Sequence, residues 1–377
     1  MLSVEQIVLR EIRLPLVEPF QISSGTTTER RILLVEVIDR SGASAWGECV
    51  GGEMPNYSPE TIDVAWLMIP EWIAPRVLGR KFGAARDVHA VLDYDFRGHN
   101  MSKAAIEMAM WALEAELRSM PLSKLLGGTR EKIPTGISLG IQKDPAAIAA
   151  KALAAHKQGY RKIKVKIKPG KDVEYIRAVC EALGPEGHVM ADANNAYTLA
   201  DLPVMKALDE LGLVMIEQPL AWDDVVQHAK LQRELRTPVC LDESITGVAQ
   251  AQNMIELDSG RIVNIKAGRV GGFAESIAIH DLCQKHGVPV WCGGMLESGI
   301  GRAHNVALAS LPNFSLPGDV SPSARYWTRD IVTPEWTMDS EGFVRVPLDK
   351  PGLGVTVDRA RIEELCVRTE SVTKKGV

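Results

Sequence analysis

Three carboxylates and two amines recur at nearly constant intervals along the middle of the chain. Asp192, Glu217 and Asp242 each come at or near the end of a short apolar run. Lys166 and Lys266 hold the equivalent places in the preceding and following runs, so the successive intervals are 26, 25, 25 and 24 residues. An apolar strand followed by helix-length sequence at this step indicates a β/α barrel, whose strand ends meet at one mouth. The five charged side chains are therefore expected to converge there.

The three carboxylates predict a magnesium site. Mutual repulsion would protonate one of three crowded carboxylates, and a divalent cation removes that conflict. Magnesium prefers oxygen ligands in octahedral geometry and leaves positions open for water or substrate. Each residue also has an ordinary explanation, since Asp192 or Asp242 can cap a helix and Glu217 can pair with a lysine. Their shared place in the repeat favours the metal, with Mn²⁺ as a substitute ion.

The lysines indicate proton transfer at a carbon atom. A metal-held substrate carboxylate would have an acidic α-proton, because the cation stabilises the enediolate that forms when this proton leaves. Lys166 and Lys266 would serve the two faces of that carbon. A base near pH 7 needs a pKa well below that of free lysine, and the metal, Lys164 and Arg269 would lower it. Alternatively, the lysines only balance the carboxylates. Asn194 is expected at the same mouth, as a substrate ligand or as a turn residue.

The fold class that would position these groups is α/β, a (β/α)7β TIM-like barrel. Lysines alternate with apolar residues over 162–167, the period of a β-strand. Taken alone, this stretch describes an edge strand with solvated lysines. Helices are expected between the strands, for example over 144–159 and 272–287. The eight predicted strands lie near 133–139, 162–167, 188–193, 213–218, 238–241, 262–266, 288–292 and 314–317.

The rest of the chain does not follow the barrel period. We expect an α+β capping domain over 1–128, the barrel over 129–320, and a segment over 321–377 that packs back on the capping domain. Alternation and turn signals predict an antiparallel meander followed by helices. The expected elements are strands at 4–14, 31–39, 42–49 and 343–346, a loop at 15–28, and helices at 58–67, 84–93 and 102–118.

The composition is that of a soluble globular enzyme. The chain has 377 residues, with 46% hydrophobic and 24% charged residues. A net charge of −5 argues against nucleic acid or an anionic membrane as the main partner. The six cysteines form no Cys-x-x-Cys pair, which favours buried thiols over a zinc site or disulfides. The first residues show no export signal and no apolar run is long enough to cross a membrane, so a cytoplasmic protein is expected.

The site motifs resemble those of the enolase superfamily. They are similar to the pattern of its muconate-lactonizing subgroup, which has Lys-x-Lys on the second barrel strand and Lys on the sixth. Stretches at 136–141, 265–272 and between 289 and 314 resemble the N-succinylamino acid racemase / o-succinylbenzoate synthase family. The likeness covers nearly the whole chain and implies bound Mg²⁺ and a small carboxylate substrate; we also expect a homo-oligomer. The matching motifs are Lys164-Val165-Lys166, Asp192-Ala193-Asn194, Glu217-Gln218-Pro219, Asp242-Glu243-Ser244 and Lys266.

The resemblance also implies roles for single residues. Lys164, Lys166 and Lys266 would be catalytic, with Glu243 and Arg269 supporting them from behind. Mandelate-racemase-like relatives use a His base on a later strand, whereas the residue on the sixth strand here is Lys266. Dipeptide epimerases hold an ammonium group with Asp-x-Asp near the seventh or eighth strand, where this chain has Met295-Leu296-Glu297. Substrate contacts are expected from two capping loops (19–25 and 51–57) and the barrel mouth, through Ser138, Asn194, Phe20, Tyr57, Gly294, Met295 and Glu297.

The leading hypothesis is Mg²⁺-dependent racemisation of N-acylamino acids, N-succinyl derivatives first. Two lysines would act through a metal-stabilised enediolate, and dehydration of the same intermediate would form o-succinylbenzoate. Three alternatives stay open: o-succinylbenzoate synthesis as the main activity, a muconate cycloisomerase, and a barrel that binds a carboxylate without catalysis. Mg²⁺-dependent hydrogen exchange at a substrate α-carbon separates an enzyme from the last of these.

The metal assignment predicts that a chelator abolishes turnover and that added Mg²⁺ restores it. Asp242→Asn should weaken metal binding, because a charged oxygen ligand is lost. Both effects can be measured by activity assays and by Mg²⁺ titration of chelator-treated protein. Full activity after chelation would contradict a metal site formed by these carboxylates.

Overall fold

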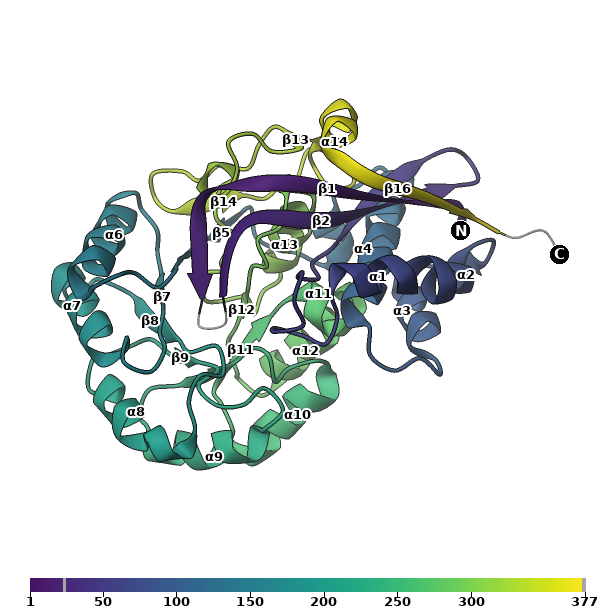
Figure 1. The fold of residues 1–377 in the computed structure, drawn as a ribbon. Coiled ribbons are helices and arrows are strands. Elements are labelled where there is room, and N and C mark those ends of the chain that lie inside the picture. The colour runs from purple at the N-terminus through teal and green to yellow at the C-terminus, as the bar shows by residue number, and fades with distance from the viewer. Residues whose placement is uncertain (23–24, 375–377) are drawn as a thin grey trace.

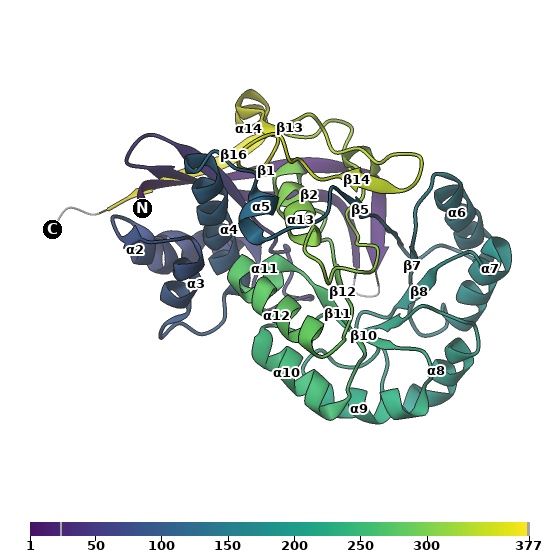
Figure 2. The same cartoon turned by 180° about the vertical axis from the view of Figure 1, so that it is seen from behind.

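The computed structural model describes residues 1–22 and 25–374 and confirms the predicted fold class. A parallel barrel wrapped by helices lies beside a separate α+β domain (Figures 1 and 2). In Figure 1 the barrel helices run from teal to green, and the purple sheet of the first domain lies across the top of the barrel. The yellow C-terminal segment returns to that sheet, so the two ends of the chain meet in the first domain.

The first domain is an antiparallel sheet packed on helices, as the alternating sequence predicts. Its sheet has the order β16-β1-β2-β3, with β4 beside β1. Helix α4 lies between this sheet and the barrel helices, and its side chains from Met101 to Ala115 are all buried. The elements are β1 (Leu2–Ile22), β2 (Gly25–Asp39), β3 (Ser44–Cys49), β4 (Lys81–Phe82), β16 (Cys366–Thr373), α1 (Ile62–Met68), η1 (Ile69–Ile73), α2 (Ala74–Val77), α3 (Arg86–Asp93) and α4 (Asn100–Leu117).

The predicted loop at 15–28 is wrong. Strands β1 and β2 continue through it as a long hairpin, with one irregularity between Pro15 and Phe20. The turn residues that suggested a loop are tolerated because this hairpin extends beyond the sheet as a two-stranded arm. Its far end reaches the barrel, where Ile141 donates a backbone hydrogen bond to Gln21 (3.0 Å; Figure 1). The expected loop 19–25 also includes Ser23 and Ser24, which lie outside the described residues.

Seven of the eight predicted barrel strands are confirmed. They form one parallel sheet in the order β12-β11-β10-β9-β8-β7-β6, and every strand residue is buried, as expected for a sheet covered on both faces. The strands are β6 (Ile137–Leu139), β7 (Ile163–Lys166), β8 (Val189–Asp192), β9 (Ile216–Glu217), β10 (Val239–Leu241), β11 (Ile262–Ile265) and β12 (Val290–Cys292). The helices between and after them are α6 (Pro145–Lys157), α7 (Val173–Leu183), η2 (Leu199–Asp201), α8 (Leu202–Asp209), α9 (Val225–Glu234), α10 (Val248–Leu257), α11 (Ala267–Val270), α12 (Phe273–Lys285) and α13 (Gly299–Ala309).

The eighth predicted strand, at 314–317, does not form as a strand. The barrel closes two residues later, where Asp319 donates to Cys292 (2.8 Å) and Gly136 donates to Gly318 (2.6 Å). This segment therefore hydrogen-bonds to β12 on one side and to the residues before β6 on the other. The pairing with the residues before β6 is one parallel bridge, Thr135 to Gly318, and on the side of β12 Pro317 has no N–H with which to extend the bond made by Asp319.

The tail contacts both halves of the molecule. The strand expected at 343–346 forms as β14 (Phe343–Arg345), but it pairs with β5 (Lys132–Pro134) at the entry to the barrel. The first predicted barrel strand is thus split into β5 and β6. Strand β16 pairs with β1, so the tail completes the first sheet. The remaining short elements are α5 (Leu122–Leu126), η3 (Ser323–Arg325), β13 (Val332–Thr333), β15 (Thr356–Val357) and α14 (Arg359–Leu365).

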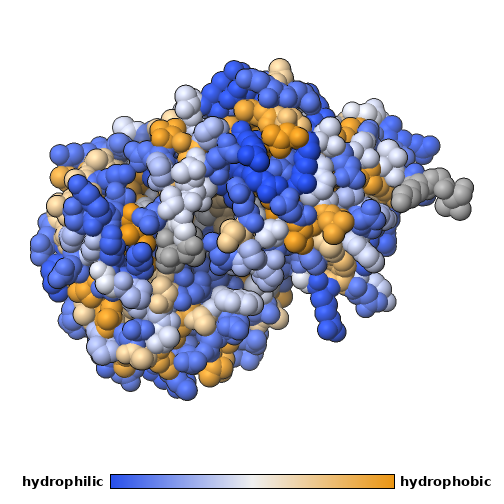
Figure 3. Space-filling view, viewed as in Figure 1, coloured by the Kyte–Doolittle hydropathy of each residue, from blue (hydrophilic) through white to orange (hydrophobic). Residues whose placement is uncertain are grey.

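The surface carries both hydrophilic and apolar residues. Hydrophilic residues predominate on the face in Figure 3, and apolar residues occur there in small groups. Among the described residues, every helix is too short or too polar to span a lipid bilayer.

Two buried carboxylates of the first domain join it to the barrel. Glu107 on α4 accepts hydrogen bonds from the backbone of Phe273 (2.7 Å) and Ala274 (2.9 Å), at the start of α12. Glu48 on β3 accepts from the backbone of Ser298 (3.1 Å) and Gly301 (3.0 Å), at the start of α13. Helix N-termini have unpaired N–H groups and a positive dipole end, so a carboxylate is a suitable partner. The first domain thereby caps the two barrel helices that follow β11 and β12.

We predict that Glu107→Ala lowers the free energy of unfolding by about 3 kcal/mol or more, at about 1–3 kcal/mol for each buried donor left unpaired. Those donors are the two backbone groups of α12 and the indole of Trp111 (2.7 Å). Urea unfolding measures the change. The control is Glu71→Ala on the surface of η1, where about 0.5 kcal/mol or less is expected. Equal midpoints for the two variants would contradict the capping role.

Candidate active site

The strand ends of the barrel bring the predicted carboxylates and lysines together. Lys164 and Lys166 lie on β7, Asp192 ends β8 and Glu217 ends β9, while Asp242 and Lys266 directly follow β10 and β11. The parallel register places Lys166 beside Asp192 and Asp192 beside Glu217. All six side chains are buried, and Lys166, the most exposed, is only 8% exposed. The repeat in the sequence therefore becomes one cluster of charges shielded from water.

The lysines of β7 contact the first two carboxylates. Lys166 Nζ lies 2.6 Å from Asp192 Oδ2. Lys164 Nζ lies 3.3 Å from the same oxygen and 3.2 Å from Glu217 Oε2. Burial alone would raise the pKa of Asp192, but Lys166 and Lys164 outweigh it and hold that pKa well below its usual range. Asp192 is therefore a carboxylate at neutral pH, as a metal ligand must be.

The opposite side of the cluster is built around Asp242. Lys266 Nζ lies 2.7 Å from Asp242 Oδ2, and Arg269 donates to the other oxygen. The Tyr57 hydroxyl, which comes from the first domain, lies 3.0 Å from Lys266 Nζ and 3.1 Å from Asp242 Oδ1. Burial lowers the pKa of Lys266, but Asp242 outweighs burial and raises it. The pKa of Lys266 is thus raised in this arrangement, whereas the sequence analysis expects a lowered pKa.

Glu217, the middle carboxylate, is buried beside Asp192, so two acidic groups lie close together away from water. Burial and then the neighbouring Asp192 raise the pKa of Glu217 to about 8. Asn264 donates to Glu217 Oε1 (2.7 Å), so one oxygen also has a neutral partner. A proton or a cation must relieve such a pair of buried carboxyl groups.

The donor set fits magnesium, although the side chains are turned to their lysine partners. Across residues 1–22 and 25–374, no three Asp, Glu, His or Cys side chains converge closely enough to hold a metal ion as arranged. The oxygens of Asp192 and Asp242 are instead occupied by Lys166, Lys266 and Arg269. Hard oxygen donors on three adjacent strand ends are nevertheless the set that Mg²⁺ prefers.

Asn194 and Glu243 form the outer edge of the cluster. Asn194 Oδ1 accepts from Lys166 Nζ (2.8 Å), and its side-chain amide donates to Glu243 Oε1 (3.2 Å). Asn194 and Asn195 both have positive φ, 42° and 64°, a conformation that asparagine tolerates better than most residues. Burial and then Asp242 raise the pKa of Glu243 to about 7. Both predicted residues therefore belong to the cluster.

The other predicted substrate residues lie on β6, on the β1–β2 arm and between β12 and α13. Ser138 on β6 is in register with Lys164, and its buried hydroxyl has no hydrogen-bond partner among the described residues. Phe20 lies on the β1–β2 arm, opposite Thr27. Gly294, Met295 and Glu297 lie between β12 and α13, and Glu297 accepts a hydrogen bond from Asn305 of α13 (2.9 Å). Their contacts with a substrate stay predictions.

Asp319 is a member of the cluster that sequence reasoning missed. Its Oδ2 lies 2.5 Å from Lys164 Nζ. A usable signal existed, because Asp319 stands at the end of the eighth barrel segment, the place that carries the other charges in the repeat. Because the eighth strand is expected at 314–317, the predicted strand end lies two residues before Asp319, and Asp319 is not among the predicted site residues. The sequence at this position is Asp319-Val320-Ser321, so this segment also lacks the Asp-x-Asp motif of dipeptide epimerases.

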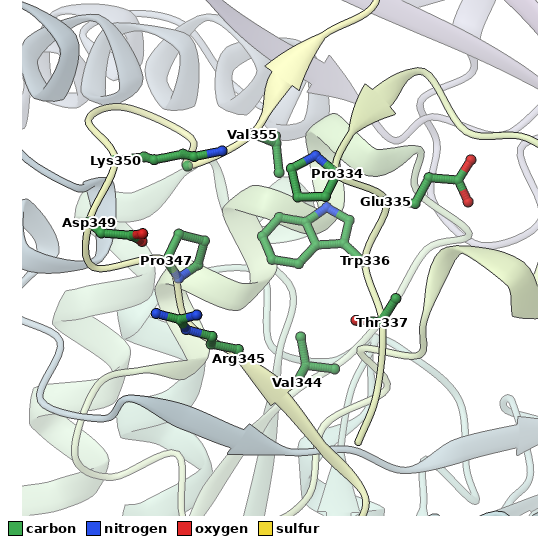
Figure 4. A pocket seen from close by; sticks show the side chains of 11 residues that line it. Pro334, Glu335, Trp336, Thr337, Val344, Arg345, Pro347, Asp349, Lys350 and Val355 are labelled. Atoms are coloured by element: carbon green, nitrogen blue, oxygen red, sulfur yellow. The ribbon is translucent and has the colours of Figure 1, made fainter. Parts of the chain in front are cut away.

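A separate cavity of about 300 Å³ is lined by residues of the tail (Figure 4). Trp336, Pro334, Pro347 and Val344 supply its apolar wall, with Arg345 and Lys350 at its edge. None of the clustered lysines or carboxylates lines it, so this cavity is not where the predicted chemistry would occur.

Comparison with known proteins defines the class of the chain. Residues 147–361 match the enolase C-terminal domain-like family, and residues 4–127 match the mandelate racemase / muconate lactonizing enzyme N-terminal domain. A solved structure of an enolase-superfamily member from Listeria innocua is 36% identical, with a TM-score of 0.95 and 100% of each chain covered. Fold and sequence together define a barrel enzyme of the enolase superfamily.

Two curated relatives narrow that class. The o-succinylbenzoate synthase of Geobacillus stearothermophilus is 48% identical over 96% of this chain and 96% of its own. The N-succinylamino acid racemase of Thermus thermophilus is 46% identical over 97% of each chain. The chain belongs to the N-succinylamino acid racemase / o-succinylbenzoate synthase family, as its motifs predict.

Gly293 has no side chain, and the side chains of Asn264 and Lys266 occupy the space where one would lie. A Cβ at this position would lie 2.3 Å from Asn264 Oδ1 and 2.6 Å from Lys266 Cε. We predict that Gly293→Ala folds but lowers kcat/KM by about 10²-fold, because it displaces Lys266, which the sequence predicts to be catalytic. The control is Gly83→Ala, where the nearest atom is the flexible carboxylate of Asp87 at 3.3 Å. Steady-state kinetics of the two variants would contradict this prediction if both matched the wild type.

Proposed function

We propose that the chain is an Mg²⁺-dependent racemase of N-acylamino acids, with N-succinyl derivatives as preferred substrates. The observation that carries the proposal is the placement of Lys166 and Lys266. They belong to strands four positions apart in the barrel, and each contacts a carboxylate from a neighbouring strand. Two amines on opposite sides of one mouth can reach opposite faces of a single carbon atom.

In this mechanism the lysines move the protons. One lysine removes the α-proton from one face, and the other delivers a proton to the opposite face, which inverts the centre. Bound by Asp192, Glu217 and Asp242, Mg²⁺ would stabilise the negative charge that the substrate carboxylate gains as the proton leaves. A cation on Asp242 would also compete with the contact that raises the pKa of Lys266.

The charge of the cluster supports a doubly negative substrate. The cluster contains five buried cationic and five buried acidic side chains, so its formal charge is zero when all of them are ionised, as they would be once Mg²⁺ replaces the proton favoured on Glu217. Mg²⁺ adds two positive charges, which an N-succinylamino acid, with its two carboxylates, would balance. A dipeptide with uncharged side chains is a zwitterion with no net charge and would leave the excess positive charge buried. The charged residues are Lys162, Lys164, Lys166, Lys266 and Arg269, and Asp192, Glu217, Asp242, Glu243 and Asp319.

A second candidate, o-succinylbenzoate synthesis as the main activity, is favoured by the relatives. Three curated o-succinylbenzoate synthases are 44–48% identical to the chain. Its substrate would also be a dicarboxylate, and elimination of a β-leaving group would follow the same proton removal. Turnover of the synthase precursor and of N-succinylamino acids by one preparation, compared as kcat/KM, decides which activity is greater.

Proton NMR in heavy water tests the two-lysine mechanism. The wild type should exchange the α-proton of both enantiomers of an N-succinylamino acid and racemise them, and should act less on dipeptides. Lys166→Ala and Lys266→Ala should each lose racemisation by about 10²–10⁴-fold, because one face has lost its acid or base.

Each variant should still exchange one enantiomer without inverting it, and the two variants should exchange opposite enantiomers. Lys157→Ala, an exposed lysine at the end of α6, serves as the control. Racemisation at the wild-type rate by either site variant would be incompatible with two bases. Exchange of the same enantiomer by both would be incompatible with their opposed placement.

A further inference from the structure

The barrel interior holds two lysines, Lys162 and Lys164, to which the proposed proton transfers assign no role. Lys162, Lys164 and Lys166 are alternate residues around β7, and all three are buried. Lys166 contacts Asp192, and Lys164 contacts Asp192 and Glu217. Lys162 is 1% exposed, and its Nζ has no hydrogen-bond partner within the described part of the chain.

Lys162 rests on a tryptophan and faces Asp319. Its Nζ lies 3.4 Å from the centroid of the Trp291 ring, a geometry in which the ring face attracts a cation. Trp291 is itself oriented by its indole N–H, which points to Cys240 Sγ at 3.3 Å. On its other side, Lys162 Nζ lies 3.6 Å from Asp319 Oδ1.

Asp319 divides its two oxygens between two lysines. Oδ1 faces Lys162, while Oδ2 contacts Lys164 Nζ at 2.5 Å. Its backbone is held by the bond from its N–H to Cys292 (2.8 Å), so the position of the carboxylate is set by barrel closure. The contact of Lys164 with Asp319 is shorter than its contacts with Asp192 (3.3 Å) and Glu217 (3.2 Å).

We propose that Asp319 is a positioning residue that draws Lys164 away from the expected metal ligands. Lys162 holds Asp319 in place through the ion pair between them. The inference rests on the proposed function. Without Asp319, the ammonium group of Lys164 would pair fully with Asp192 and Glu217 and occupy oxygens that a cation needs. With Asp319 present, Lys164 has a counter-ion of its own, and those oxygens can turn to the metal.

A double-mutant cycle on Mg²⁺ affinity tests this role, with calorimetric titration of the full chain as the readout. Asp319→Asn should weaken Mg²⁺ binding by about 10-fold or more, the range found when a partner behind a metal site is removed. In a Lys164→Met background the same change should alter affinity by less than about 2-fold, because the competing amine is gone.

Two further variants keep the test decisive. Lys162→Met should weaken Mg²⁺ binding in the same direction but by less, and it replaces Asp319→Asn in the cycle if that variant does not fold. Lys103→Met, which removes a buried lysine paired with Asp93 outside the barrel, should leave affinity unchanged.

Two outcomes overturn the inference while the proposed function stands. One is an Mg²⁺ affinity of Asp319→Asn equal to that of the wild type. The other is a loss of equal size with and without Lys164, which would indicate a long-range charge effect or a purely structural ion pair. A wild-type protein that binds no Mg²⁺ would instead overturn the proposed function, and this inference with it.

Discussion

Every charge buried in the barrel mouth needs a partner, and the rest of the site depends on that constraint. An uncompensated ion in a water-excluded interior costs several kcal/mol, so each lysine and carboxylate here must be matched within a few ångströms. Asp192 is matched by Lys166 and Asp242 by Lys266, each across neighbouring strands. In this parallel barrel the strand ends supply both signs, with lysines at β7 and β11 and carboxylates at the three strands between them.

The first domain contributes to this balance from outside the barrel. Tyr57 reaches into the cluster and contacts Lys266, while Glu48 and Glu107 cap the helices that follow β12 and β11. The loop that carries a site residue and the carboxylates that fix the nearby helices thus come from the same domain. Displacement of that domain would admit water to the cluster and uncap two helices at once.

The sequence predicts most of the barrel and the centre of the site, because both follow a repeat of about 25 residues. A strand end that carries a charge at each step identifies Asp192, Glu217, Asp242 and the lysines without any long-range information. Prediction fails where the repeat is broken. The eighth strand is expected at 314–317, but the barrel closes through Gly318 and Asp319, so Asp319 is not predicted as a site residue. Glu107 could not be assigned as a helix cap, since its partner Phe273 is 166 residues away in sequence. The described residues of the arm, 15–22 and 25–28, have the composition of a loop, and only their pairing between β1 and β2 makes them strands.

The pairing of β16 with β1 has a consequence for the order of folding during synthesis. The first domain is translated first, but its sheet lacks its outer strand until residues 366–373 have left the ribosome. Its helix α4 also packs on barrel helices that are translated later. The nascent chain must therefore carry an open edge strand past the synthesis of the entire barrel, and domains whose strand edges are unpaired are prone to aggregate. For this chain, the domain that is made first is the last that can be completed.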